Sequence, residues 1–161
     1  MRLSKVISGG QTGVDRAGLD SAHQAGIPIG GYCPKGRKAE DGTIPERYPL
    51  EELTSAQYTV RTEKNVIESD GTLILNKGVL STGTKLTLEY TVTHGKPHLI
   101  VLLEDPIDPA NVMLWVRREN IHILNIAGTR ESKIPEGIYN DALLYLNKVF
   151  TQLKENKSCP I

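Results

Sequence analysis

Three short turns rich in glycine and threonine contain the residues of this chain best suited to hold a ligand. They read Gly10-Gln11-Thr12-Gly13, Thr82-Gly83-Thr84 and Gly128-Thr129-Arg130, and each follows a candidate strand. Glycine lets the backbone approach a ligand closely, and free N–H groups at a helix N-terminus bind phosphate or another oxyanion. We therefore expect the N–H groups of Gly10 to Val14 and of Gly83 to Lys85 to hold an anion, with Arg130 neutralising further charge.

The first turn also carries a helix start signal. Thr12 and Asp15 have the spacing of a capping box, which predicts that Asp15 caps the helix rather than contacts the ligand. Small residues then recur at helical spacing, so this helix can lie close against a sheet. They are Val14, Ala17, Gly18, Ser21, Ala22 and Ala25.

A charged segment, CPKGRKAEDGTIPERYPL at positions 33–50, is the second candidate for chemistry. A loop of this length inside a compact domain is uncommon unless it has a function. Lys35, Arg37 and Lys38 could meet an anion, while Glu40 and Asp41 could bind a hydroxyl or an amine. The alternative interpretation is a loop whose charges are merely solvated.

The elements that must position these residues alternate between strand and helix. We expect strands at 5–7, 27–32, 71–76, 97–103 and 121–126. We expect helices after Thr12, at 62–69, after Asp108-Pro109, and near the C-terminus, the last with Ile138, Ala142, Leu146, Val149 and Leu153 on one face. Alternating polarity at 86–93 favours a strand, but parallel strands need a crossover, so we predict a helix from about Gly83 to Gly95.

Apolar strands that alternate with helices predict an α/β fold. Its mostly parallel sheet of about five strands is covered by helices on both faces. Ligands of such sheets bind at the carboxyl ends of the strands, near a topological switch point. The three glycine turns are therefore expected at one edge of the sheet, around an anionic ligand such as a nucleotide or a phosphorylated cofactor.

The composition excludes several classes of protein. At 161 residues the chain suits one domain, and 19 basic and 19 acidic residues cancel, so neither nucleic acid nor a membrane is an expected partner. No segment is long and apolar enough to span a membrane, and the N-terminus enters a strand too soon for a signal peptide. Cys33 and Cys159 lack metal-ligand spacing and are expected as free thiols of a cytoplasmic protein. The scattered histidines predict no metal-ligand cluster.

Two long blocks, ISGGQTGVDRAGLDSA and GYCPKGRKAEDGTIPERYPL, resemble the molybdenum-cofactor carrier proteins, circularly permuted YpsA-like members of the SLOG superfamily. The resemblance runs from about Lys5 to Tyr139. It implies a single Rossmann-like, three-layer SLOG-type domain over residues 1–161, assembled as a homo-oligomer (dimer or tetramer). It places the ligand at three loops: Gly9, Gly10, Gln11, Thr12, Gly13 and Asp15; Lys35, Gly36, Arg37, Glu40, Asp41 and Gly42; and Ser81, Gly83 and Thr84.

The same superfamily includes phosphoribohydrolases of the Lonely Guy type, whose motif is Pro-Gly-Gly-x-Gly-Thr-x-x-Glu. Here the double glycine is missing, and the carboxylate of Glu89 comes five residues after Thr84 instead of three. On a helix this adds a rotation of roughly 200°. Glu89 is therefore expected to point away from the ligand, which argues against transferring the hydrolase activity.

Three functions stay open at this point. The first, which we favour, is a binding protein for the molybdenum cofactor or a nucleotide, with Arg37, Lys38 or Arg130 on the phosphate. The second is an enzyme that cleaves a nucleoside phosphate, with Glu40 or Asp41 as general base. The third is an oligomeric interaction module whose glycine turns are structural.

Overall fold

A parallel sheet forms the centre of the protein. Among residues 3–155, which the computed structural model describes (with side chains to residue 152), five strands form this sheet in the order β2-β1-β9-β7-β8. They are β1 (Lys5–Ile7), β2 (Ile29–Gly30), β7 (Gly71–Asn76), β8 (His98–Leu102) and β9 (Ile123–Gly128). All four pairs of neighbouring strands are parallel. The predicted fold class is confirmed.

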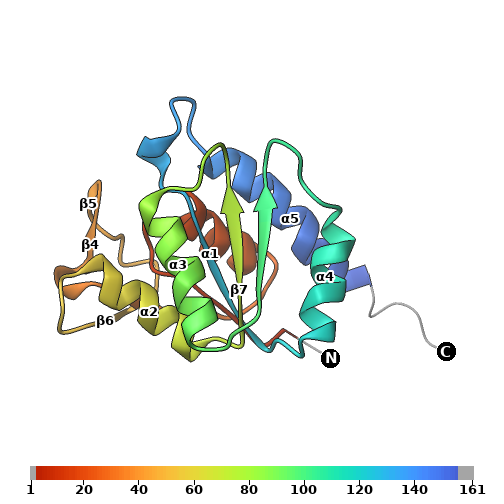
Figure 1. Ribbon diagram of the computed structural model, residues 1–161, viewed down its shortest axis with the longest axis horizontal. Helices are drawn as coiled ribbons and strands as arrows, with labels where there is room; N and C mark the ends of the chain where they lie inside the picture. Colours follow the sequence, from red (N-terminus) through yellow and green to blue (C-terminus); the bar gives the residue numbers. More distant parts are fainter. Residues whose placement is uncertain (1–2, 156–161) are drawn as a thin grey trace.

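Helices cover both faces of the sheet and complete a Rossmann-like three-layer sandwich (Figure 1). One face carries α1 (Val14–Gln24), α4 (Pro109–Arg118) and α5 (Tyr139–Glu155), and α5 packs against both of the others. The other face carries α2 (Tyr58–Glu68) and α3 (Thr82–Thr93), which also contact each other. The two helical layers therefore cover sheet faces of different chemistry.

Successive residues of a strand point to opposite faces, and here the two faces differ in polarity. Leu73 and Leu75 of β7 join the large apolar core beneath α1, α4 and α5. The alternate residues Thr72 and Asn76 are buried and polar, and Asn125 of β9 donates to the Thr72 hydroxyl at 3.2 Å. The face beneath α2 and α3 is thus built to hold hydrogen-bonding groups.

The charged segment folds into a small unit of its own. It contains β3 (Tyr32–Cys33), paired with β6 (Glu51–Glu52), the 3-10 turn η1 (Lys35–Arg37) and the hairpin of β4 (Lys38–Ala39) and β5 (Gly42–Thr43). Its apolar residues pack with Leu19 of α1 in a second core. They are Cys33, Ala39, Ile44, Tyr48 and Leu50. The segment is therefore a packed structure rather than a solvated loop.

The predicted single strand at 27–32 is wrong. Gly31 adopts a positive φ of 126° and separates β2 from β3, which lie in different sheets. A Cβ at this position would lie 2.1 Å from the Ser8 carbonyl oxygen, so the backbone directly after β1 passes too close for any other residue.

Two predicted helix starts are also wrong. Gly13, not Thr12, occupies the N-cap of α1, without a side-chain cap, and the Asp15 carboxylate accepts from Gln11 N, outside the helix. Helix α2 begins at Tyr58, four residues before the predicted start, and the Thr62 hydroxyl bonds back to the Tyr58 carbonyl inside it. Asp15 and Thr62 thus bond to nearby backbone groups instead of capping a helix, as short polar side chains often do.

Other expectations are confirmed. Residues 82–93 form a helix whose N-cap is Ser81, which accepts from Thr84 N. Asp108 caps α4 through Ala110 N, with proline as its first residue. Ile138 and the next three predicted residues of the α5 face are buried, and the last strand lies two residues later than expected. The side chain of Leu153, and Cys159, lie outside the described residues.

Candidate functional site

A cleft opens at the carboxyl ends of β1, β7 and β9, between α2 and α3, and has a volume of about 310 Å³. The chain leaves β1 for one edge of the sheet and β7 for the other, so this is a topological switch point. Seven predicted site residues line the cleft: Gly9, Gln11, Asp15, Ser81, Gly83, Thr84 and Arg130. The expectation that the three glycine turns meet at one edge of the sheet is confirmed.

The first turn does not offer the backbone donors that we expected. Gly10 N donates to the Ser8 hydroxyl and Gln11 N to the Asp15 carboxylate. Thr12 N donates to the Gln11 side chain, and Val14 N donates to the Thr129 carbonyl. These N–H groups are bonded within the protein and are therefore not free for an anion. Among the four residues of this turn, Gln11 alone lines the cleft.

The amide of Gln11 is held in one orientation. Its Oε1 accepts from Thr12 N at 3.1 Å and from Glu40 N at 2.9 Å. The residue is 5% exposed and lines the cleft, yet its Nε2 has no hydrogen-bond partner among the described residues. A buried amide nitrogen without a partner costs about 1–3 kcal/mol, and such an atom in a cleft marks a place for a ligand acceptor.

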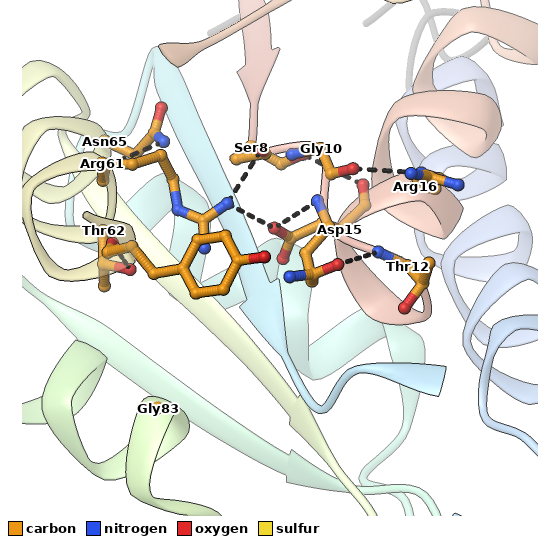
Figure 2. A network of polar contacts seen from close by, with 12 residues as sticks. Ser8, Gly10, Thr12, Asp15, Arg16, Arg61, Thr62, Asn65 and Gly83 are labelled. Atoms are coloured by element: carbon orange, nitrogen blue, oxygen red, sulfur yellow. Dashed lines mark hydrogen bonds and ion pairs between the residues drawn. The ribbon is translucent and has the colours of Figure 1, made fainter. Parts of the chain in front are cut away.

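Asp15 and Gln11 are both buried and form the buried end of the cleft. The Asp15 carboxylate faces the guanidinium of Arg61 there (Figure 2). Burial raises the pKa of its carboxyl, and the positive charge of Arg61, 4.0 Å away, opposes that rise. Its Oδ2 accepts from Gln11 N at 3.2 Å. A buried carboxylate with a shifted pKa in a cleft is a candidate for ligand recognition.

Cations surround one aromatic ring at the cleft. Arg61 donates from Nη1 to the Gly9 carbonyl at 2.9 Å, and burial lowers the pKa of its guanidinium. Around the ring centroid of Tyr58 lie the charged groups of Lys38 at 5.2 Å, Arg61 at 5.3 Å and Arg130 at 5.4 Å. This side of the cleft is therefore electropositive.

The N-terminus of α3 forms the facing wall. Ser81 caps it, and its hydroxyl lies 3.0 Å from that of Thr84. A Cβ added to Gly83 would meet no atom within 4 Å, so this residue leaves the helix end open to the cleft (Figure 2). Thr84 N donates to the Ser81 hydroxyl and Lys85 N to the Ser81 carbonyl, so two of the three predicted donors, Gly83 to Lys85, are already bonded. The first N–H groups of the helix, at Thr82 and Gly83, have no acceptor within it, and together with the helix dipole they attract anions.

The three basic residues of the charged segment, Lys35, Arg37 and Lys38, lie in three different environments. Arg37 donates to the carbonyls of four residues in its own segment: Ile44, Pro45, Tyr48 and Leu50. Lys35 is exposed and does not line the cleft, whereas Lys38 reaches the Tyr58 ring. Arg37 therefore holds the segment in shape rather than facing the cleft.

The two acidic residues of the segment attach it to the first turn. Glu40 accepts from the hydroxyl of Thr12 and from the hydroxyl of Ser132 at 2.5 Å. Burial would raise the pKa of Glu40, but these hydrogen bonds outweigh it and lower the pKa. Arg16 binds Asp41 through two bonds of 2.6 and 2.8 Å, which lower the pKa of that carboxyl.

The remaining predicted residues are structural neighbours of the cleft. A Cβ on Gly10 would lie 2.5 Å from Leu50 beneath the charged segment, and Gly10 has a φ of 74°. Gly13, with a φ of 80°, packs against the Thr129 carbonyl. Thr12 bridges Glu40 and Glu131 N. Substituting these residues would disturb the turn itself.

Several lining residues were missed from the sequence. Five lie on α2, and four of them have helical spacing: Tyr58, Arg61, Thr62 and Asn65, with Thr59 beside the first. Others, including Thr87, Asn125 and Lys133, come from α3, β9 and η2 (Glu131–Lys133). Those four α2 residues recur at i, i+3, i+4 and i+7, so a correct helix start would have shown this polar face.

Glu89 is exposed and does not line the cleft, as expected. The position three residues after Thr84 is occupied by Thr87, which is buried, lines the cleft and donates to the Gly83 carbonyl. The structure thus places a threonine hydroxyl where the hydrolase motif has its carboxylate.

The part of the chain that the structure describes holds neither a metal-ligand cluster nor a membrane-spanning helix. No group of three or more His, Cys, Asp or Glu residues there could hold a metal ion. No helix in that part is long and apolar enough to cross a membrane.

Comparison with known proteins places the chain in a family. A crystal structure described as "Putative molybdenum carrier protein from Syntrophus aciditrophicus SB" is 46% identical, with a TM-score of 0.84, over 92% of this chain and 94% of that one. No curated protein matches the sequence. The model of the circularly permutated YpsA SLOG family matches residues 6–150. The chain therefore belongs to the circularly permuted YpsA family of SLOG proteins.

Proposed function

We propose that this protein binds and carries a phosphorylated small molecule, with its phosphate between Arg130, Lys133 and the N-terminus of α3. One observation carries the proposal: cationic side chains and an open helix end converge on one cleft. Arg61, Arg130 and Lys133 line it against the single lining carboxylate of Asp15. Guanidinium and ammonium groups bind phosphate through charge-assisted hydrogen bonds.

The molybdenum cofactor is the cargo that we propose, since a similar protein of known structure is described as a molybdenum carrier. This cofactor has a phosphate and a pterin ring system, and the cleft offers groups for both. The cations of the rim suit the phosphate, and the Gln11 amide with the Asp15 carboxylate suits a polar ring edge. At about 310 Å³ the cleft lies at the lower end of the range for small-molecule sites.

A carrier role is favoured over hydrolysis by two observations. Thr87 stands at the position where the hydrolase motif has glutamate. Glu40 and Asp41, the alternative bases, are engaged by Ser132 and Arg16 and do not line the cleft. An assembly of two or four copies stays a prediction, which native mass spectrometry of the purified protein would test.

Titration calorimetry with inorganic phosphate, GMP and the molybdenum cofactor tests the proposal. Arg130→Ala or Lys133→Ala should weaken binding of every phosphorylated probe by about 1.5–3 kcal/mol, or roughly 10- to 150-fold. Lys35→Ala, the matched control on an exposed lysine outside the cleft, should bind like the wild type. Equal affinities for wild type and both cleft variants would contradict the assignment.

A further inference from the structure

The buried end of the cleft has a hydrogen-bonding pattern that the proposed phosphate site does not use. It consists of the Gln11 amide and the Asp15 carboxylate, which are joined through the Gln11 backbone N–H. Both residues are more than nine-tenths buried, at 5% and 8% exposure. Polar groups buried this deeply are usually bonded to something.

The donor is fixed by the fold. Exchanging the oxygen and nitrogen of the Gln11 amide would place its NH₂ group against two other donors, the N–H groups of Thr12 and Glu40. The nitrogen must therefore occupy the position without a partner, where it has hydrogens to give. A ligand at this end has to present an acceptor to it.

The acceptor lies beside it. Of the two Asp15 oxygens, Oδ2 takes the Gln11 N–H, and Arg61 stays 4.0 Å away because its Nη1 is committed to the Gly9 carbonyl. No hydrogen bond to Oδ1 is present in the described part of the chain. An ionised carboxylate only accepts, and it can take several donors. A ligand at this end therefore needs N–H groups next to its acceptor.

We propose that this end of the cleft recognises the 2-amino-4-oxopyrimidine edge that guanine and pterins share. Its ring carbonyl would accept from Gln11 Nε2, while its ring N–H and amino group would donate to Asp15. Adenine presents one amino group and a ring nitrogen acceptor on the corresponding edge, so it leaves the carboxylate with fewer donors. The inference rests on the proposed function, since it assumes that the phosphorylated ligand occupies this cleft.

Calorimetry on the full chain with GMP, IMP, AMP, XMP and a phosphorylated dihydroneopterin tests this specificity. We expect the wild type to bind GMP about tenfold or more tighter than AMP, with IMP, which lacks the amino group, in between. Comparison of the phosphorylated pterin with GMP shows whether the cleft prefers a pterin or a guanine nucleotide, since both carry the same edge. AMP binding as tightly as GMP and the phosphorylated pterin would overturn the inference.

Asp15→Asn should change which base is preferred, an effect that is not expected if Asp15 only stabilises the fold. The new amide would donate to the 2-oxo group of xanthine, so the variant should lose about tenfold for GMP and bind XMP more tightly than GMP. Gln11→Glu keeps the oxygen that Thr12 and Glu40 use but removes the donor, so it should weaken GMP and pterin binding. If only the pterin binds, its loss in both variants supports the inference.

Inorganic phosphate separates the two proposals. In both variants the loss for GMP or the pterin should exceed any change in the affinity for inorganic phosphate, whereas Arg130→Ala should weaken phosphate and GMP alike. Phosphate binding that depends on Arg130, combined with no preference for the guanine or pterin edge, would refute the inference and leave the proposed function standing. Absence of binding by every phosphorylated probe would refute both. Should Asp15→Asn fail to fold, the wild-type GMP, IMP and AMP series and Gln11→Glu still decide.

Discussion

Arg61 offers the sharpest test of the electrostatics inside the cleft. It is 7% exposed, donates to the Gly9 carbonyl at 2.9 Å and lies 4.0 Å from the Asp15 carboxylate. Arg61→Leu leaves a buried carbonyl without its donor, at a cost of about 1–3 kcal/mol. It also leaves Asp15 without its nearest cation, and breaking a buried pair costs about 3–5 kcal/mol in all. Since the two charges share no hydrogen bond, we expect a loss of about 3 kcal/mol.

Urea and thermal unfolding measure this loss. For a chain of this size, about 3 kcal/mol corresponds to a fall in melting temperature of roughly 6–12 °C. Lys64→Leu, on the same helix but with a side chain that is 39% exposed and pairs with Glu68 at the surface, is the matched control and should lower the melting temperature far less.

Asp15→Asn in the Arg61→Leu background should recover part of the loss, because it removes the carboxylate whose ionisation is disfavoured by burial. An Arg61→Leu protein within about 1 kcal/mol of wild type, or a further loss in the double variant, would show that water screens these charges.

Three further outcomes are expected. Gly83→Val should reduce affinity for phosphate and GMP at least about tenfold, because its side chain would occupy the open space of the cleft at the end of α3. Since a Cβ at this position would meet no atom within 4 Å, the melting temperature should change little. Unchanged affinity in calorimetry would show that this helix end is not part of the site. Glu89→Ala, on the exposed side of α3, should change affinity less than about threefold, and a larger loss would mean that the helix is turned differently. For Glu40, whose folded pKa is lowered below 4.5, the ionised form stabilises the fold above pH 4.5, and this contribution disappears as the pH falls through the folded pKa. The melting temperatures of wild type and Glu40→Gln should therefore differ at pH 6, and the difference should shrink as the pH falls through the folded pKa; a constant difference would contradict the assigned bonds.

Strand and helix alternation predicted the fold well because it depends on local pattern and on one rule of chain connection. The segment at 86–93 shows the limit of periodicity alone. This segment lies in α3, and the buried residues of that helix are all threonines: Thr84, Thr87 and Thr91. These threonines follow helical spacing. The apolar residues Leu86 and Leu88 instead alternate with polar ones, and that alternation indicates a strand. The need for a crossover between parallel strands corrected this, because topology does not depend on which residues are apolar.

The candidate site was predictable only in part. The sequence places glycine turns after β1, β7 and β9, and parallel packing brings them to one edge. It does not show that α2 crosses this edge, because Gln57 gives no side-chain cap and the helix start was missed. Tyr58 and Arg61 were therefore not predicted as site residues. Nor does it show that the charged segment turns its Arg37 inward, onto its own carbonyl oxygens.

Hydrogen-bond satisfaction separates structural polar groups from ligand-binding ones on this face of the sheet. Asn76 accepts from the Thr129 hydroxyl at 2.8 Å, and Asn65 bonds the backbone of Tyr32 on both sides of its amide. These groups are complete without a ligand, so their burial costs little. Among the described residues, Gln11 Nε2 is the one fully inaccessible side-chain nitrogen or oxygen that the protein leaves unpaired. A fold that satisfies the other inaccessible side-chain groups and leaves this one open, beside a carboxylate and below a cationic rim, has its free hydrogen-bonding capacity at the place where a ligand would complete it.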